Sequence, residues 1–176
     1  KLMNLNKNLI FLGMMGSGKS SVGYLVSKKL NLKFFDIDQL IEKNEGMAIS
    51  TIFTKKGEID FRKLEEKITL KTLKSKNSII ALGGGGFINE KIRNEVIRNH
   101  LSFWLNWSDY ILLKRIKDSK KRPLAFNSTP QEIKQLIKKR TKIYSKAKFK
   151  INCNKLSKNE IVKEVIKNYE LCKITS

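Results

Sequence analysis

The stretch FLGMMGSGKSSVGYLV, residues 11–26, determines how the rest of the chain can be interpreted. An apolar run leads into three glycines, a lysine and two serines, and residues 13–20 match the pattern G-x-x-x-x-G-K-[S/T]. The run before the glycines is typical of a strand and the residues from Lys19 onward of a helix, which is the context that this pattern needs. Glycines let the backbone wrap closely around phosphate, and the helix start adds partial positive charge. We therefore expect a polyphosphate-binding loop.

The same loop predicts ATP or GTP as a ligand, together with Mg²⁺. Lys19 is expected to reach the β and γ phosphates, and the Ser20 hydroxyl to bind Mg²⁺, which prefers oxygen ligands. The loop alone does not indicate which molecule receives the phosphate. The residues expected to contact the nucleotide are Gly13, Met14, Met15, Gly16, Ser17, Gly18, Lys19, Ser20 and Ser21.

Length and composition narrow the class of protein. The chain has 176 residues, 40% of them hydrophobic, which suits a single domain over residues 1–176. No apolar run approaches the roughly 18 residues that a membrane span requires, so we expect no membrane segment. The first residues lack the apolar middle of a secretory signal, and there are only two cysteines, which favours a reducing cytoplasm.

The chain is strongly basic, with 37 Lys and Arg against 16 Asp and Glu and a net charge of +21. Such a charge raises the possibility of nucleic-acid binding. The lysines run through every segment and form no basic tail, so a compositional bias explains much of the charge and no specific nucleic acid is expected. Arginine is informative in this background, because only six are present and the planar guanidinium suits bidentate binding of carboxylate or phosphate.

Apolar runs of strand length alternate with longer amphipathic stretches. The expected strands cover residues 8–13, 32–38, 78–84, 101–107 and 149–153. The expected helices cover about 18–30, 38–46, 48–74 with a break near Gly57, 89–99, 108–118, 131–146 and 157–170. This alternation predicts an α/β fold, with a five-stranded and mainly parallel sheet flanked by helices on both faces. The long polar connection at about 117–130 is expected to be functional or mobile.

Two carboxylates follow the second expected strand. Asp36 and Asp38 alternate in FFDIDQLIEK, and a period of two points both side chains to one side of a strand. Ligands of parallel sheets collect at the carboxyl ends of the strands, which places both acids beside the phosphate loop. One carboxylate near Mg²⁺ and one near a hydroxyl nucleophile would suit phosphoryl transfer to an alcohol. The alternative makes Asp38 only the N-cap of the next helix.

Later stretches carry weaker signals. Arg62 and Glu65 are spaced for an ion pair on a helix, which taken alone would be a solvated pair. Residues 83–86 are four consecutive glycines, where the backbone must approach something closely or adopt a conformation barred to other residues. His100, the lone histidine, lies away from every motif and is expected at the surface or in packing.

In their order and spacing these motifs resemble shikimate kinases, from about Leu9 to Ile166. The stretch after Arg140 departs from the family in lacking a Pro-Leu before the tyrosine. The chain meets each motif of the family pattern in order. The first three are G-x-x-G-x-G-K-[S/T] at Gly13 to Ser20, D-x-D at Asp36 and Asp38, and F-R-x-x-E at Phe61-Arg62 with Glu65. The last three are G-G-G at Gly83 to Gly85, R-P-L at Arg122-Pro123-Leu124, and R-x-x-x-Y-x-x-A at Arg140 with Tyr144 and Ala147. The resemblance implies a P-loop kinase fold with a mobile lid at about 117–130 and a substrate-binding helical segment at about 38–74.

The resemblance also implies roles for individual residues. Lys19, Asp38 and Arg122 would be catalytic, with Asp38 binding the shikimate hydroxyls and acting as general base, and Arg122 closing over the transferred phosphoryl group. Asp36 would hold Mg²⁺ together with Ser20. Arg62 and Arg140 would bind the shikimate carboxylate, and the backbone of Gly84 and Gly85 would contact the same ligand. Arg115 would stack on adenine.

The activity so implied is transfer of the γ-phosphoryl group of ATP to the 3-hydroxyl of shikimate, a step of aromatic amino acid biosynthesis, by a cytoplasmic monomer. Two alternatives stay open. One is another P-loop small-molecule or nucleotide kinase, acting for example on gluconate or a nucleoside monophosphate, and the other is a nucleic-acid-binding P-loop NTPase. Two arginines placed for one carboxylate favour a small acid as the acceptor.

Overall fold

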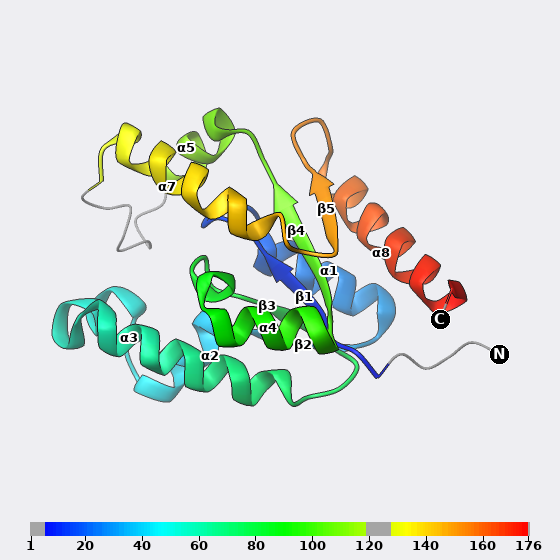
Figure 1. Ribbon diagram of the computed structural model, residues 1–176, viewed down its shortest axis with the longest axis horizontal. Coiled ribbons are helices and arrows are strands. Elements are labelled where there is room, and N and C mark those ends of the chain that lie inside the picture. The colour runs from blue at the N-terminus through cyan, green and yellow to red at the C-terminus, as the bar shows by residue number, and fades with distance from the viewer. Residues whose placement is uncertain (1–5, 119–127, 176) are drawn as a thin grey trace.

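Strand β1 (Leu9–Leu12), which leads into the phosphate loop, lies in the middle of the sheet, and all four of its residues are buried. The computed structural model describes residues 6–118 and 128–175. Its five strands are all parallel and follow the order β2-β3-β1-β4-β5 (Figure 1). The other strands are β2 (Lys33–Asp36), β3 (Ser78–Ala81), β4 (Leu101–Asn106) and β5 (Phe149–Asn152). The predicted α/β fold with a five-stranded parallel sheet is confirmed.

The strand order explains where a ligand can bind. The chain leaves β1 toward β2 on one side, and it leaves the neighbouring β3 toward β4 on the other side. Right-handed crossovers therefore place the two connecting helices on opposite faces of the sheet. Adjacent strands whose connections diverge leave a crevice at their carboxyl ends. The phosphate loop and the glycine-rich turn, residues 83–86, both begin at this crevice.

The helices lie between the strands as the sequence pattern predicts, and most boundaries agree within two residues of the expected ones. None of the helices in the described part of the chain is long and apolar enough to cross a membrane. Figure 1 shows α4 and α7 in front of the sheet and α1 behind it, beside α8. The helices are α1 (Lys19–Leu30), α2 (Ile37–Glu45), α3 (Ile49–Leu73), the short 3₁₀ helix η1 (Gly86–Ile88), α4 (Glu90–Asn99), α5 (Asp109–Lys117), α7 (Pro130–Tyr144) and α8 (Lys158–Thr175).

The break expected near Gly57 is present inside α3. Gly57 has φ 81° and ψ 170°, a backbone conformation that favours glycine and interrupts the helix. The interruption bends α3, so that the rings of Phe53 and Phe61 on either side of it lie 4.5 Å apart between centroids. Helices α2 and α3 pack on each other, and α3 also contacts α4. The bend therefore forms an aromatic wall on the side of the sheet where β2 lies.

The prediction for Asp36 and Asp38 was wrong in its local structure. Strand β2 ends at Asp36, and Asp38 lies in the first turn of α2, so a period of two does not relate the two side chains. Asp36, and not Asp38, is the N-cap, because its Oδ1 accepts a hydrogen bond of 3.1 Å from the Gln39 backbone N–H. The strand ends early because this capping bond begins the helix at Ile37.

A buried asparagine joins several elements at the amino ends of the central strands, opposite the phosphate loop. The Asn8 side chain is fully buried, and its Nδ2 donates to the carbonyls of Leu73 at 3.1 Å and Ser75 at 2.6 Å. Its Oδ1 accepts from the Ser78 N–H at 3.0 Å. One side chain thus joins the end of α3 and the start of β3 to β1, which sets the register of the two central strands.

We expect Asn8→Ala to lower the free energy of unfolding by about 2–4 kcal/mol, because it leaves several buried backbone groups unpaired. Urea denaturation measures this change. Asn44→Ala is the control, because the Asn44 amide is exposed and donates only to neighbouring Glu45; its effect should stay within about 0.5 kcal/mol. Equal losses in the two variants would contradict the clamp role of Asn8.

Candidate active site

The loop between β1 and α1 has the backbone of a phosphate-binding turn. Gly13, Gly16 and Gly18 have φ values of 144°, 82° and 90°, which side chains rarely permit. Lys19 is 9% exposed, and its Nζ donates to the carbonyls of Gly13 and Met14, both at 2.9 Å. The ammonium group therefore lies within the loop, at the start of α1, where phosphate oxygens are stabilised by the helix N-terminus.

The two serines after Lys19 have different surroundings. The Ser20 hydroxyl donates to Oδ2 of Asp36, which is 8% exposed, whereas the Ser21 hydroxyl donates to the Gly18 carbonyl at 3.2 Å. Ser20 and Asp36 thus present adjacent hydroxyl and carboxylate oxygens next to the phosphate loop. This pair of oxygens fits the ligand preference of Mg²⁺, which keeps several waters and takes few protein ligands.

Asp38 is half-buried at the start of α2. Burial, and then the negative charge of Asp36, raise the pKa of Asp38 to about 6, and Glu65 adds to the effect while Lys19 opposes it. A carboxylate with such a pKa can accept a proton near neutral pH more readily than an ordinary aspartate. Asp38 therefore has the properties of a general base.

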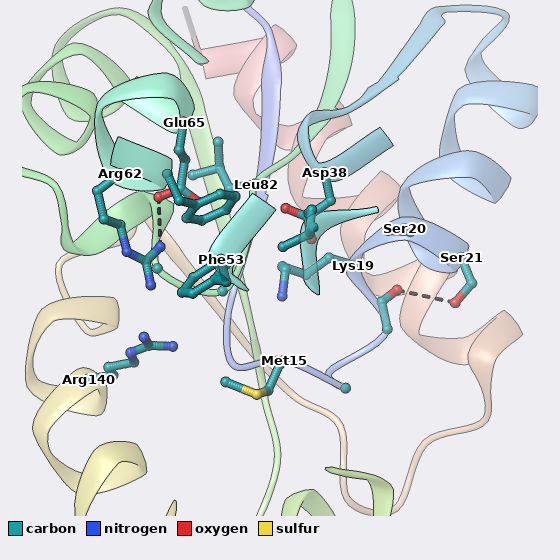
Figure 2. Close-up of a pocket in the computed structure, with 16 residues that line it drawn as sticks. Met15, Lys19, Ser20, Ser21, Asp38, Phe53, Arg62, Glu65, Leu82 and Arg140 are labelled. Carbon is teal, nitrogen blue, oxygen red and sulfur yellow. Dashed lines mark hydrogen bonds and ion pairs between the residues drawn. The ribbon is translucent and has the colours of Figure 1, made fainter. Parts of the chain in front are cut away.

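Arg62 and Glu65 form a partly buried ion pair. The Arg62 Nη1 donates to Glu65 Oε1 at 2.8 Å, and Figure 2 shows the two side chains facing each other on the wall formed by α3. The expectation of a solvated pair was wrong, because Glu65 is only 2% exposed. A buried carboxylate requires a partner, so Glu65 holds the guanidinium in one orientation.

The glycine-rich turn allows these charged groups to approach the backbone. A Cβ atom at Gly83 would lie 2.8 Å from Asp38 Oδ1 and 2.8 Å from Glu65 Oε2. A Cβ atom at Gly85 would lie 2.8 Å from Arg62 Cζ. Both separations are shorter than van der Waals contact. Neither glycine has a positive φ, so the expected backbone conformation barred to other residues is absent at these positions. The glycines instead leave room for the charged side chains.

Helix α7 supplies the second arginine of the site. Arg140 is 7% exposed, and its Nη1 has no hydrogen-bond partner among the described residues. One turn later, the Tyr144 hydroxyl donates to the Gly84 carbonyl at 2.5 Å, and burial raises the pKa of Tyr144 to about 12. A buried guanidinium N–H without a partner indicates that Arg140 is placed to bind an acceptor from a ligand.

One pocket of about 370 Å³ collects most of the predicted site residues. In Figure 2 the guanidinium groups of Arg62 and Arg140 lie on one side of it, and Lys19 and Asp38 lie on the other. The predicted residues that line it are Met15, Gly16, Gly18, Lys19, Ser20, Ser21, Asp38, Arg62, Gly84, Gly85 and Arg140.

Other predicted residues lie outside this lining. Asp36 contacts the site through Ser20, and Gly13, Met14 and Ser17 form the base of the loop. Arg115 lies on the far side of the loop, where its Nη1 donates to the Gly16 carbonyl at 3.0 Å. Arg122 and most of the expected lid lie outside the described residues.

Sequence reasoning missed several residues of the site. Ile49 and Phe53 line the pocket, and Trp107 donates from its indole N–H to the Ser17 carbonyl at 2.8 Å. A single apolar residue in a helix is normally part of the core, so no local pattern distinguished Ile49 or Phe53. His100 is 8% exposed, and its Nδ1 accepts from the Asn8 N–H, in agreement with a packing role.

The chain matches proteins of one family along most of its length. The family model described as shikimate kinase matches residues 15–170. The shikimate kinase of Thermodesulfovibrio yellowstonii is 40% identical over 165 residues, which cover 93% of this chain and 95% of that protein. The shikimate kinase of Bacillus subtilis is 37% identical over 174 residues, which cover 94% of this chain and 90% of the relative.

Solved structures agree with the sequence match. A shikimate kinase from Acinetobacter baumannii in complex with shikimate superposes with a TM-score of 0.91 at 27% identity, covering 97% of this chain and 96% of that one. The shikimate kinase from Aquifex aeolicus superposes with a TM-score of 0.83 at 39% identity, covering 93% and 96%.

Two kinases of the first alternative class match this chain at the level of the fold. A gluconokinase from Sinorhizobium meliloti has a TM-score of 0.59 at 14% identity and covers 98% of this chain and 97% of its own. A deoxyadenosine kinase from M. mycoides has a TM-score of 0.62 at 17% identity and covers 94% and 99%. The family match, by contrast, covers residues 15–170, which include most of the phosphate loop, the Arg62–Glu65 pair, the glycine-rich turn and Arg140, so the chain belongs to the shikimate kinase family.

Proposed function

We propose that the chain transfers the γ-phosphoryl group of ATP to the 3-hydroxyl of shikimate, giving shikimate 3-phosphate and ADP. The observation that carries this proposal is the pair of arginines, Arg62 and Arg140, in the same pocket as the phosphate-loop lysine. Two guanidinium groups on one side of a cavity suit a single carboxylate. The family match supports shikimate, a small hydroxylated acid, as the ligand that brings this carboxylate.

The acceptor binds between the two arginines and Asp38 in this account. Arg62 and Arg140 hold the carboxylate, and the backbone of Gly84 and Gly85 contacts the same molecule. The opposite end of the acceptor then points its hydroxyls toward Asp38 and Lys19, which lie across the pocket (Figure 2). Positioning of this kind converts the reaction of two molecules into a reaction within one complex. The helical segment at about 38–74 is accordingly the acceptor-binding part of the domain.

Asp38 takes the proton of the attacking hydroxyl in this proposal. Its raised pKa narrows the difference in proton affinity between the base and the alcohol while leaving the carboxylate largely ionised near neutral pH. The proton moves from the 3-hydroxyl to a carboxylate oxygen of Asp38 as the new O–P bond forms, and the bond from the γ-phosphorus to the β-γ bridging oxygen breaks. The leaving oxygen carries the electron pair away on ADP.

The donor binds along the loop. The N–H groups of residues 13–20 and the Lys19 ammonium hold the β and γ phosphates, with Ser21 and Arg115 adding contacts to the nucleotide. Ser20 and Asp36 are the residues that would hold Mg²⁺, which would neutralise charge on the phosphoryl oxygens. Lys19 stabilises the negative charge that develops on the leaving group. The same contribution from Arg122 remains a prediction, as do the monomeric state and cytoplasmic location.

The reaction is tested by ADP release from Mg-ATP with and without shikimate, with gluconate and a nucleoside monophosphate mixture as controls. About 0.15 M salt suppresses loose binding to a chain of this charge. We expect strong stimulation by shikimate alone, and loss of most turnover in Lys19→Ala with an unchanged fold by circular dichroism. Stimulation by a control acceptor instead, or an active Lys19→Ala variant, would overturn the proposal.

The pH dependence of catalysis tests the role of Asp38. A base must be ionised, so kcat/KM should rise with pH and be lost as the pH falls below about 6. Asp38→Asn should lower kcat by roughly 10²–10⁴ and remove this dependence. Asp60→Asn, an exposed site on α3, is the matched control and should keep the wild-type profile. An unchanged profile in Asp38→Asn would exclude the base role.

A charge-conserving variant tests the carboxylate contact. Arg62→Lys keeps the positive charge and loses the bidentate fork, so KM for shikimate should rise about tenfold or more. Steady-state kinetics with varied shikimate at saturating ATP give this value. Arg98→Lys, at an exposed position of α4, should leave KM within about twofold. If both variants keep the wild-type KM, Arg62 is only structural.

A further inference from the structure

Carbonyl oxygens of the phosphate loop need hydrogen-bond donors that hold them away from the phosphates. A loop that turns its N–H groups toward an anion must direct carbonyls elsewhere, because a carbonyl oxygen repels phosphate. Three of them are satisfied from within the loop and α1. Gly13 and Met14 accept from Lys19, and Gly18 accepts from the Val22 N–H at 2.9 Å.

The two carbonyls in the middle of the loop depend on residues from another part of the chain. The Ser17 carbonyl accepts from Trp107 Nε1 at 2.8 Å, and the Gly16 carbonyl accepts from Arg115 Nη1 at 3.0 Å. Trp107 follows the end of β4, and Arg115 lies eight residues later in α5. The segment after β4 therefore supports the loop at the point where its two central carbonyls turn outward.

The same two side chains stack on each other. Arg115 Cζ lies 3.9 Å from the centroid of the Trp107 ring, within the range of a cation–π contact. The stack is one-sided: Trp107 is 9% exposed, whereas Arg115 is an exposed residue. One face of the guanidinium is therefore covered by the indole, and its orientation is further fixed by the bond to Gly16.

We propose that Trp107 is a positioning residue for the nucleotide, which fixes the loop through its N–H and fixes Arg115 through its ring. The inference rests on the proposed function in taking ATP as the donor and Arg115 as a residue that contacts its base. Arginine on its own loses considerable rotamer freedom when it stacks on a base. Held on the indole, Arg115 is already oriented, and the guanidinium face away from Trp107 serves as a platform for the purine.

Two variants and two ligands separate the effect of the Trp107 N–H on the loop from the effect of its ring on Arg115. Trp107→Phe keeps an aromatic face under Arg115 and loses the N–H to Ser17, whereas Trp107→Leu loses both. Pyrophosphate reports on the loop alone, and ADP reports on the loop and the base platform together. Isothermal titration calorimetry of both ligands in the presence of Mg²⁺ needs no acceptor, so its outcome is independent of whether shikimate is the substrate.

We expect Trp107→Phe to weaken both ligands by about threefold, the effect of one lost hydrogen bond. Trp107→Leu should weaken pyrophosphate by a similar factor and ADP by about tenfold or more, because only ADP uses the platform. Trp104→Phe is the control, since Trp104 lies in β4, is 3% exposed and packs on Tyr144, whereas the donors to the Gly16 and Ser17 carbonyls are Arg115 and Trp107. It should keep the ADP affinity within about twofold.

Two results would overturn the inference. ADP affinity in Trp107→Leu within about twofold of wild type would mean that Arg115 needs no support. Equal weakening of ADP and pyrophosphate in Trp107→Leu would restrict Trp107 to a structural role in the loop. If Trp107→Leu does not fold, Trp107→Phe and Arg115→Leu decide: the inference requires Arg115→Leu to weaken ADP more than pyrophosphate, and equal weakening rejects it.

Discussion

Charged side chains lie close to the turn at residues 83–86 only because residues 83 and 85 have no Cβ atom. Asp38 and Glu65 approach Gly83 from α2 and α3, and Arg62 lies against Gly85. A Cβ atom at either position would require the nearby carboxylates or guanidinium to shift from the positions they have in the structure. The observed positions of Asp38, Glu65 and Arg62 in the pocket therefore depend on the small size of these two residues.

The balance of charges inside the pocket follows from this arrangement. Glu65 is buried and bonds to Arg62, so it neutralises part of the positive charge while it fixes the direction of the guanidinium. Asp38 gains a raised pKa from its burial and from its acidic neighbours. Glu65 thus orients Arg62, which binds the acceptor, and also contributes to the raised pKa of Asp38, which takes the proton of the acceptor.

The sequence alone was sufficient for the fold and for most residues of the pocket. Hydrophobic periodicity predicted the five parallel strands, and the phosphate loop follows from glycine spacing and Lys19 because its chemistry is local. The scarcity of arginine in a lysine-rich chain drew attention to Arg62 and Arg140 for a physical reason, the bidentate fork.

The features that the sequence did not predict depend mainly on contacts between segments that are distant in the chain. The burial of Glu65 requires α3 to pack against the glycine-rich turn, so its spacing to Arg62 alone indicated a solvated pair. The capping bond of Asp36 ended β2 two residues early and moved Asp38 into α2. The bond from Trp107 to Ser17 joins residues that are 90 positions apart. No local pattern contains the contacts of Glu65 and Trp107, because the fold brings their partners together from distant parts of the chain. The cap from Asp36 to Gln39 is local, but the apolar, strand-like run before it masked the start of the helix.

The central claim is that Arg62 and Arg140 select an acceptor by its carboxylate. Calorimetric titration of the protein with shikimate and with shikimate methyl ester tests it most directly, because the two ligands share every hydroxyl and differ in one negative charge. We expect the ester to bind at least about 100-fold more weakly, the combined effect of losing charge-assisted hydrogen bonds to two guanidinium groups. Equal affinities for the acid and the ester would contradict it.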